Sequence, residues 1–288
     1  MATAMWTWPS GGLFPKMFNW NLNMAARTEN RGAITASTNA TTITSGAANT
    51  KGSYTDIGST TTFDYEAISV FLGNASTTAN FVFDIAINVG GNRFIIAEDL
   101  HSENLKDGHW ASYDPLPIHV PSGSQLSARC AASVASATID LIIIGHSIGL
   151  FGAPGYSRCR ALYTPSSSRG INCDPGGTAH TKTRTQITAS TPDRVVGLMV
   201  TIGGGGDAAR SATRWLFDIE AGGAGSEQVI IPNMFAGCGA ICDVPPQTVF
   251  GPFPCDIPTA TRLACNIQCS ITTAGDRVPD ICLHGFVP

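Results

Sequence analysis

The chain has 288 residues, only 13% of them charged, and a formal net charge of −4 at pH 7. This balance leaves no basic surface to hold a phosphate backbone, so we expect no nucleic-acid partner. No stretch reaches the roughly 18 consecutive apolar residues of a membrane helix, so we expect no membrane partner. The 31 glycines and 17 prolines, with Thr and Ser tracts between short apolar runs, favour many short strands.

The N-terminal segment, residues 1–45, is predicted to be an extended arm. It lacks the basic region and the continuous apolar run of a signal peptide. Glycines and prolines interrupt its aromatic residues, which excludes a regular helix. The segment could be a strand packed on its own domain, but we favour an arm that docks on another subunit. The proposed anchors are Trp6, Trp8, Phe14, Phe18 and Trp20.

The chain contains an internal repeat. FVFDIAINVGGNRFIIAEDL at 81–100 resembles WLFDIEAGGAGSEQVIIPNM at 215–234. Four more pairs match in the same order: ANTK (48–51) with AHTK (179–182), ISVFLG from Ile68 with LMVTIG from Leu198, PIHVPSGSQLSARC from Pro117 with PCDIPTATRLACNI from Pro254, and DLIIIGH from Asp140 with DICLHGF from Asp280. Five collinear matches at a nearly constant offset indicate duplication.

Each copy contains six or more strand-length runs within roughly 100 residues, the usual size of an antiparallel sandwich. We therefore predict an all-β chain made of two tandem antiparallel jelly-roll-like β-sandwich domains. The predicted domains are 46–150 and 176–288, joined by a Gly-, Pro- and Ser-rich linker at 151–175.

The stretch GHSIG at 145–149 matches the GxSxG nucleophile elbow, which would make Ser147 the nucleophile of a serine hydrolase. The elbow needs a helix directly after the serine, whereas a loop sequence, GLFGAPGYSR, follows here. The corresponding stretch of copy two, 285–287, has no serine. The motif is therefore interpreted as a last strand that runs into the linker.

A second tempting motif is TIGGGGDAARSA from Thr201, a loose match to a dinucleotide-binding loop. A strand-like run, WLFDIE, follows within a few residues, where such a loop requires a helix. We interpret this stretch as a strand connection.

The third tempting stretch is EDLHSENLKDGH, which contains Glu98, Asp99, His101, Glu103 and His109. These residues could form a metal site or an acid–base pair. Copy two has no histidine over the same span, so the favoured interpretation is a solvated loop. We predict no catalytic residues, no metal and no cofactor.

Asp84 and Asp218 occupy the same place in the two FDI runs. An acidic residue repeated at a strand position is typical of an architectural role. We expect each aspartate to accept hydrogen bonds or to pair with Arg93 or Arg214.

Nine cysteines are many, and they lie mostly in the linker and copy two. The CxxxC spacings could bind zinc but lack the CxxC knuckles of structural sites. In a strand, Cys265 and Cys269 would lie about 13 Å apart at roughly 3.3 Å per residue, too far for a mutual bridge. We predict disulfides, with Cys159–Cys173 as the local pair and an oxidising environment as the consequence. The candidates are Cys159, Cys173, Cys238, Cys242, Cys255, Cys265, Cys269 and Cys282.

The repeated runs FVFDIAI…NRFIIAEDL…LPIHVPSGSQLSARC and WLFDIEAGGAGSEQVIIPNM…FPCDIPTATRLACNIQCS resemble the tandem jelly-roll virion proteins of tailed bacteriophages. The resemblance covers roughly residues 45–288 and excludes the aromatic arm. It implies a structural component of the virion, with capsid decoration, collar and tail-associated roles found among such proteins. It transfers no catalytic or binding residues.

The leading hypothesis is a non-enzymatic virion structural protein, specifically a capsid decoration (cement) protein that binds neighbouring capsid subunits. Its partners would be the major capsid protein or neck and tail components, and further copies of itself. It would be located in the virion, which assembles in the host cytoplasm. One alternative is a receptor- or carbohydrate-binding protein with a loop site at Asp107, His109, Trp110 and Tyr113, and a remote one is the serine hydrolase with Ser147.

Overall fold

The computed structural model describes residues 27–32, 40–103, 110–148, 155–203, 212–238 and 247–288. The described residues form eighteen strands and one four-residue helix, α1 (Ala274–Arg277). None of the described helical residues forms a segment long and apolar enough to cross a membrane. The prediction of an all-β protein is therefore confirmed.

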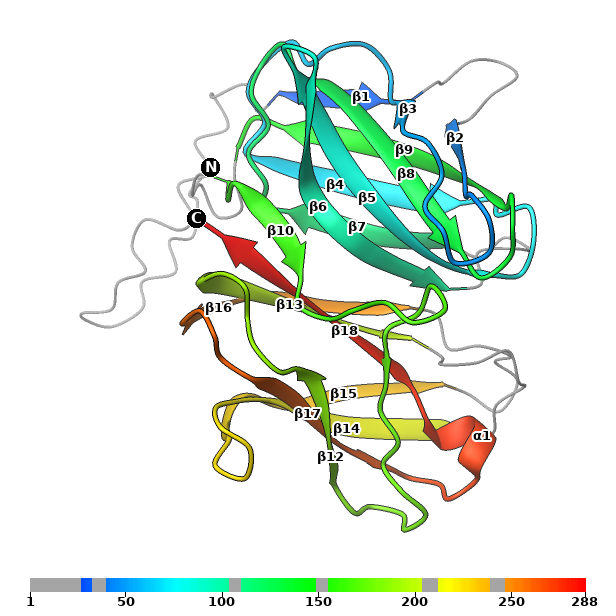
Figure 1. Cartoon of the computed structure of the whole chain (residues 1–288), viewed down its shortest axis with the longest axis vertical. Helices are drawn as coiled ribbons and strands as arrows, with labels where there is room; N and C mark the ends of the chain where they lie inside the picture. The colour runs from blue at the N-terminus through cyan, green and yellow to red at the C-terminus, as the bar shows by residue number, and fades with distance from the viewer. Residues whose placement is uncertain (1–26, 33–39, 104–109, 149–154, 204–211, 239–246) are drawn as a thin grey trace, which may run out of the picture.

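The N-terminal half is a jelly roll of two sheets, drawn in blue to green in Figure 1. One sheet has the order β1-β9-β4-β7, with β2 also on β9, and the other contains β6-β5-β8-β3. Long buried strands such as β5, with eight of its ten residues buried, form the core between the sheets. The strands are β1 (Thr28–Arg31), β2 (Thr41–Thr44), β3 (Thr55–Asp56), β4 (Ala67–Gly73), β5 (Asn80–Val89), β6 (Asn92–Glu103), β7 (Trp110–Leu116), β8 (Gln125–Ala132) and β9 (Thr138–His146).

The C-terminal half repeats this topology strand for strand. Its sheets have the orders β10-β18-β13-β16, with β11 also on β18, and β12-β17-β14-β15. A second core cluster lies between them. The strands are β10 (Arg158–Ala161), β11 (Ile171–Asn172), β12 (Thr183–Thr188), β13 (Val195–Gly203), β14 (Thr213–Ala221), β15 (Gln228–Cys238), β16 (Thr248–Ile257), β17 (Leu263–Cys269) and β18 (Asp280–Val287).

The two halves share one continuous nine-stranded sheet. Strand β10 pairs with β18 of its own half and, in parallel, with β6 of the other half, where Cys159 is opposite Ala97. Figure 1 shows β10 between the two halves. Strands β10 and β11 lie inside the predicted linker and pair with β18 as β1 and β2 pair with β9. The domain boundaries given above stay a prediction.

The repeated aspartates have the same structural role in both halves. Asp84 accepts hydrogen bonds from Lys51 Nζ at 2.7 and 2.8 Å and from the amide of Asp99 at 3.1 Å. In both halves the register of the strand pair shifts next to the aspartate, after Phe83 and after Phe217. The carboxylate therefore satisfies a backbone donor that the bulge leaves outside the ladder.

Asp218 repeats the arrangement, with an ion pair to Lys182 and a 2.7 Å bond from the amide of Asn233. The prediction that each aspartate accepts hydrogen bonds is confirmed, but the predicted ion-pair partners Arg93 and Arg214 were wrong. Arg93 instead pairs with Asp56, 3.2 Å away. In each half a lysine pairs with the aspartate, Lys51 with Asp84 and Lys182 with Asp218. These lysines end the matching runs ANTK and AHTK, so the pairing is part of the repeat.

The first glycine of GHSIG has a packing role. A Cβ atom on Gly145 would overlap the ring of Tyr65, and one on Gly285 would lie 2.7 Å from Val195 Cγ2. Gly145 pairs with Ile68 as Gly285 pairs with Leu198, so the two glycines correspond. Beyond the end of β9 the amide of Ser147 donates a 2.9 Å bond to the carbonyl oxygen of Arg27, and the Ser147 hydroxyl accepts a 2.8 Å bond from the Arg27 amide.

The cysteine prediction is not supported among the described residues. Seven cysteines there are free thiols: Cys130, Cys159, Cys173, Cys255, Cys265, Cys269 and Cys282. The predicted pair Cys159–Cys173 is wrong, because Cys159 belongs to the N-terminal core and Cys173 to the C-terminal one. The Cys238 side chain and Cys242 lie outside the described residues, as do the arm aromatics Trp6 to Trp20 and the segment 204–211.

Candidate functional site

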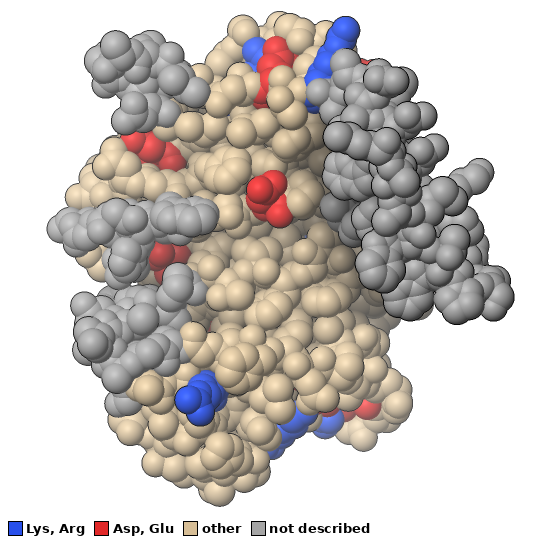
Figure 2. All heavy atoms as spheres, turned by 180° about the vertical axis from the view of Figure 1, so that it is seen from behind, with Lys and Arg blue, Asp and Glu red and all other residues tan. Residues whose placement is uncertain are grey.

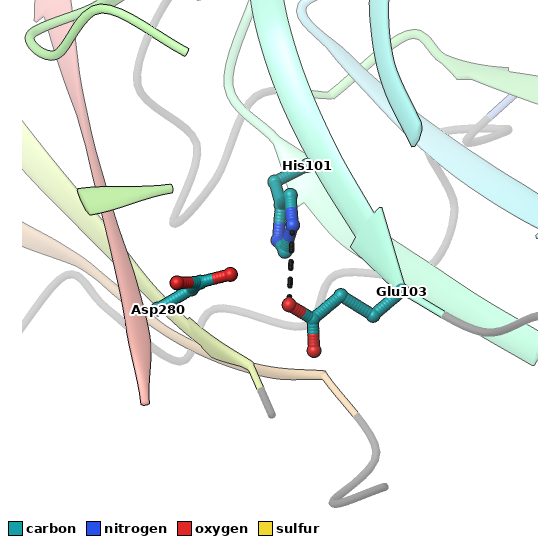
Figure 3. A group of neighbouring side chains, drawn as sticks. All are labelled: His101, Glu103 and Asp280. Atoms are coloured by element: carbon teal, nitrogen blue, oxygen red, sulfur yellow. Dashed lines mark ion pairs between the residues drawn. The ribbon is translucent and has the colours of Figure 1, made fainter. Parts of the chain in front are cut away.

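A buried polar cluster lies where the two halves meet. His101 and Glu103 come from the end of β6, and Asp280 comes from the start of β18. Successive residues of a strand point to opposite faces, so His101 and Glu103 project from the same face of β6. Figure 3 shows the imidazole and the two carboxylates converging on one place.

The cluster is shielded from solvent. His101 and Asp280 are 0% exposed, and Glu103 is 4% exposed. One potential ligand atom from each residue lies within 4.8 Å of the others, and His101 Nε2 is 3.5 Å from Glu103 Oε1. Both ring nitrogens of His101 lack a hydrogen-bond partner among the described residues.

Neighbouring strands fix the backbone that carries this cluster. The hydroxyl of Tyr113 donates a 2.5 Å bond to the carbonyl oxygen of His101. Tyr163 donates through its hydroxyl to the carbonyl oxygen of Asp99 at 2.6 Å, and His284 Nε2 donates to the same oxygen at 3.0 Å. The C-terminal end of β6 is thus held in place by side chains from both halves.

Burial keeps the histidines of this region neutral. Burial lowers the pKa of His101, with Arg169 adding to the effect and Glu103 opposing it. Burial lowers the pKa of His284 to about 4, against the bond to Asp99. A neutral imidazole keeps a nitrogen lone pair, which is the state that ligates metals.

The cluster therefore offers the donors of a divalent-cation site. Imidazole suits zinc and its neighbours in the transition series, and carboxylates suit both these ions and harder ones. The arrangement corrects the prediction of a solvated loop, because Asp99, His101 and Glu103 all lie in β6, where His101 and Glu103 are buried and Asp99 is half-buried. His109 lies outside the described residues.

Sequence reasoning missed this cluster for a physical reason. The second copy has no histidine in the span that corresponds to EDLHSENLKDGH, and this absence argued against a metal site. Asp280 belongs to the other copy, 177 positions further along the chain than Glu103. The pairing of β10 with both β6 and β18 brings the two copies together here.

The predicted loop site at Asp107, His109, Trp110 and Tyr113 loses one member. Tyr113 is 0% exposed and packs edge-on against Phe83 in the core, so it cannot face a glycan. Alternation along β7 buries this position. Asp107, His109 and the side chain of Trp110 lie outside the described residues, so their role stays a prediction.

A second polar cluster lies on the sheet of β4, β7 and β9. Ser69 Oγ lies 2.7 Å from His146 Nε2 and also donates to Asp114 Oδ1. In a catalytic triad the carboxylate orients the histidine, whereas here both groups bind the serine, which is 1% exposed. This cluster therefore lacks the order of a triad, and Ser147 is bonded to Arg27 instead of to a histidine.

Comparisons with known proteins give structural matches only. No protein-family model matches the sequence. A search of the curated proteins finds no match.

Three solved structures illustrate the matches. A chain of Broad bean stain virus is 11% identical, with 77% of this chain and 76% of that chain covered and a TM-score of 0.30. PNGase F, an N-glycanase, is 11% identical with 91% and 96% covered and a TM-score of 0.36. A tandem CBM22 domain from Paenibacillus barcinonensis is 10% identical with 92% of each chain covered and a TM-score of 0.23.

These matches correct one prediction. The chain was expected not to be an enzyme, but its structural neighbours include the N-glycanase PNGase F, so that exclusion is withdrawn. At these TM-scores no activity is transferred to the chain. The neighbours include viral proteins, but no tailed-bacteriophage family is shown.

Proposed function

We propose that the chain is a structural protein of a virus particle, and more specifically a decoration protein that binds neighbouring capsid subunits. The observation that carries this proposal is the duplicated jelly roll, in which two pairs of residues shared by the copies serve the fold. Asp84 and Asp218 hold equivalent bulges, and Gly145 and Gly285 admit equivalent side chains. Selection that maintains two rigid sandwiches in tandem suits a building block.

The junction supports the same proposal. A continuous sheet and a buried polar interface join the halves, so the molecule can present broad faces in a fixed relation. Figure 2 shows one of these faces, where acidic and basic side chains are few and scattered. A surface with few charged groups has a low cost of desolvation when it docks on other proteins.

The arm and the partners remain proposals from the sequence. The aromatic segment that includes Trp6 and Trp20 would anchor the protein on the major capsid protein or on neck and tail components. Self-association of the protein and residence in a virion assembled in the host cytoplasm belong to the same proposal.

The test is incorporation into particles. The full chain and a variant lacking residues 1–25 are expressed during infection, and purified particles are probed for each. We expect the full chain to cosediment with particles and the shortened chain to be strongly depleted. As a control for length, a variant with Trp6, Trp8 and Trp20 changed to alanine should show the same depletion. Absence of the full chain from particles would refute the structural role, and equal incorporation of the variants would refute the arm.

A further inference from the structure

The junction between the jelly rolls contains side chains that converge without an evident structural need for their chemistry. His101 and Glu103 project from β6, and Asp280 projects from β18 to meet them (Figure 3). All three are buried. We propose that these residues bind one divalent cation of the zinc class, which joins the N-terminal and C-terminal jelly rolls.

The state of His101 is the first argument. A buried polar group without a hydrogen bond costs roughly 1–3 kcal/mol, so such groups are rare in folded proteins. His101 is fully buried and has no hydrogen bond from either ring nitrogen among the described residues. Its ring lies against the carboxylates, so a cation there would give the imidazole a partner.

Charge is the second argument. Two acidic side chains meet the imidazole in a site that is shielded from solvent. Carboxylate and imidazole groups are ligands that zinc binds in proteins, and a low-dielectric site strengthens their attraction for a cation. Arg169 lies close enough to act electrostatically on His101.

The space around Glu103 is the third argument. Gly203 on β13 lies against its carboxylate, and a Cβ atom there would be 2.6 Å from Glu103 Oε2. The glycine therefore permits the position that Glu103 takes. Larger residues at 203 would push the carboxylate away from His101.

The donor set indicates which cation fits. Ligand atoms of a tetrahedral zinc site lie roughly 3.3 Å apart, given bonds of about 2.0–2.1 Å. The 3.5 Å between His101 Nε2 and Glu103 Oε1 already approaches this spacing. One imidazole with two carboxylates favours zinc or manganese over calcium or magnesium, which prefer oxygen donors alone.

The site belongs to the junction and has no counterpart within a single jelly roll. Counting from the shared aspartates Asp84 and Asp218, the position of His101 corresponds to Phe235, which is 60% exposed. Asp140, which corresponds to Asp280, bonds instead to Thr42 and Asn74. The cluster therefore arose where the two copies touch, as expected for a ligand that joins them.

The first experiment measures metal content of the full chain. Protein treated with a chelator is dialysed against micromolar zinc, and bound metal is counted by mass spectrometry. We expect one zinc per wild-type chain and at least tenfold weaker binding in Asp280→Asn and His101→Gln. His119→Gln is the matched control, because His119 Nδ1 lies 3.4 Å from Glu66 Oε2 in a partly exposed pair that has no third ligand among the described residues. The control should bind zinc as the wild type does.

The second experiment does not depend on removing a ligand. Gly203→Ala keeps all three side chains but displaces the carboxylate of Glu103, so it should weaken zinc binding. Circular dichroism of every variant and of the wild type checks that each protein is folded. Cobalt bound to the wild type should give the visible bands of a low-coordinate site. Zinc should displace the bound cobalt, whereas calcium at the same concentration should not.

Several results would overturn the proposal. A wild-type chain that retains no stoichiometric zinc or cobalt refutes it even if every variant fails to fold. Unchanged binding in both Asp280→Asn and His101→Gln refutes the assigned ligands. Because these measurements use the isolated chain, they stand apart from the test of incorporation into particles.

Discussion

The two jelly rolls of this chain share their framework and differ in what they add to it. Each contains a buried aspartate that accepts a hydrogen bond from a backbone amide fifteen positions further along the chain and pairs with a lysine. In the N-terminal half Arg129 also binds Asp84, with its Nε 2.9 Å from Oδ2. The corresponding residue of the C-terminal half is Asn266, which donates to Glu220 instead.

The differences concentrate at the contact between the halves. Glu98 on β6 lies 3.7 Å from Arg160 of β10, whereas Pro232 takes the corresponding place on β15, which is an edge strand. Proline removes a donor from that edge and so discourages a further strand from pairing there. The two copies thus share a framework but differ at one sheet edge: β6 pairs with a further strand, whereas β15 does not in the described part of the chain. Residues that differ between the copies indicate which surfaces are in contact.

The largest expected effect is the loss of stability when either repeated aspartate is replaced, and it should differ between the two halves. Asp84 is 0% exposed and pairs with two cations, whereas Asp218 is 5% exposed and, among the residues that the structure describes, pairs with Lys182 alone. We expect Asp84→Asn to lower the free energy of unfolding by about 3 kcal/mol and Asp218→Asn by about 2 kcal/mol, because each removes a buried anion from partly buried cations. Urea unfolding followed by circular dichroism measures both.

The exposed pair Arg194–Asp256 provides the control for charge removal. Both side chains are more than 60% exposed, so Asp256→Asn should leave the urea midpoint unchanged. Equal losses for Asp84→Asn and Asp218→Asn would show that Arg129 contributes nothing to the difference between the halves.

A smaller effect tests a core position filled differently in each half. Trp215 corresponds to Phe81, and its indole Nε1 donates a 2.7 Å bond to the carbonyl oxygen of Arg277 at the end of α1. Trp215→Phe should cost about 2 kcal/mol, from a cavity and an unpaired carbonyl. Thermal unfolding measures the loss.

The reverse exchange, Phe81→Trp, sharpens the same comparison. Phe81 is 0% exposed, so the larger ring should overpack the N-terminal core and cost about 1–3 kcal/mol. If either exchange left the thermal stability unchanged, the cavities around Phe81 and Trp215 would not differ in the way that these two predictions assume.

The sequence allowed the all-β fold and the duplication to be predicted because strand patterns and collinear matches are local signals. FDI and its glycine hairpin predicted β5, β6, β14 and β15 without knowledge of their neighbours. The partners of Asp84 were mispredicted because Lys51 reaches it across 33 positions that carry no pairing signal. The buried cluster of His101 and Asp280 could not be predicted, since it depends on how one copy docks on the other.

Strand β1 gives the smallest expected effect and a dependence on pH. Glu29 on β1 pairs with Gly145 where Arg160 on β10 pairs with Gly285, so the copies place opposite charges at one position. Burial would raise the pKa of Glu29, but hydrogen bonds from Tyr65, Arg31 and Thr62 lower it from 4.5 to about 2.

A lowered carboxyl pKa stabilises the folded state above the unfolded value and loses that contribution as the pH falls through the folded one. Glu29→Gln should therefore cost about 1 kcal/mol at pH 7, and the difference from the wild type should shrink between pH 4.5 and pH 2. Urea unfolding of both proteins across this range measures it. Parallel stability curves down to pH 2 would mean that the charge of Glu29 does not hold β1 against Tyr65. The position would then tolerate either sign of charge, as its occupation by Arg160 in the other copy would suggest.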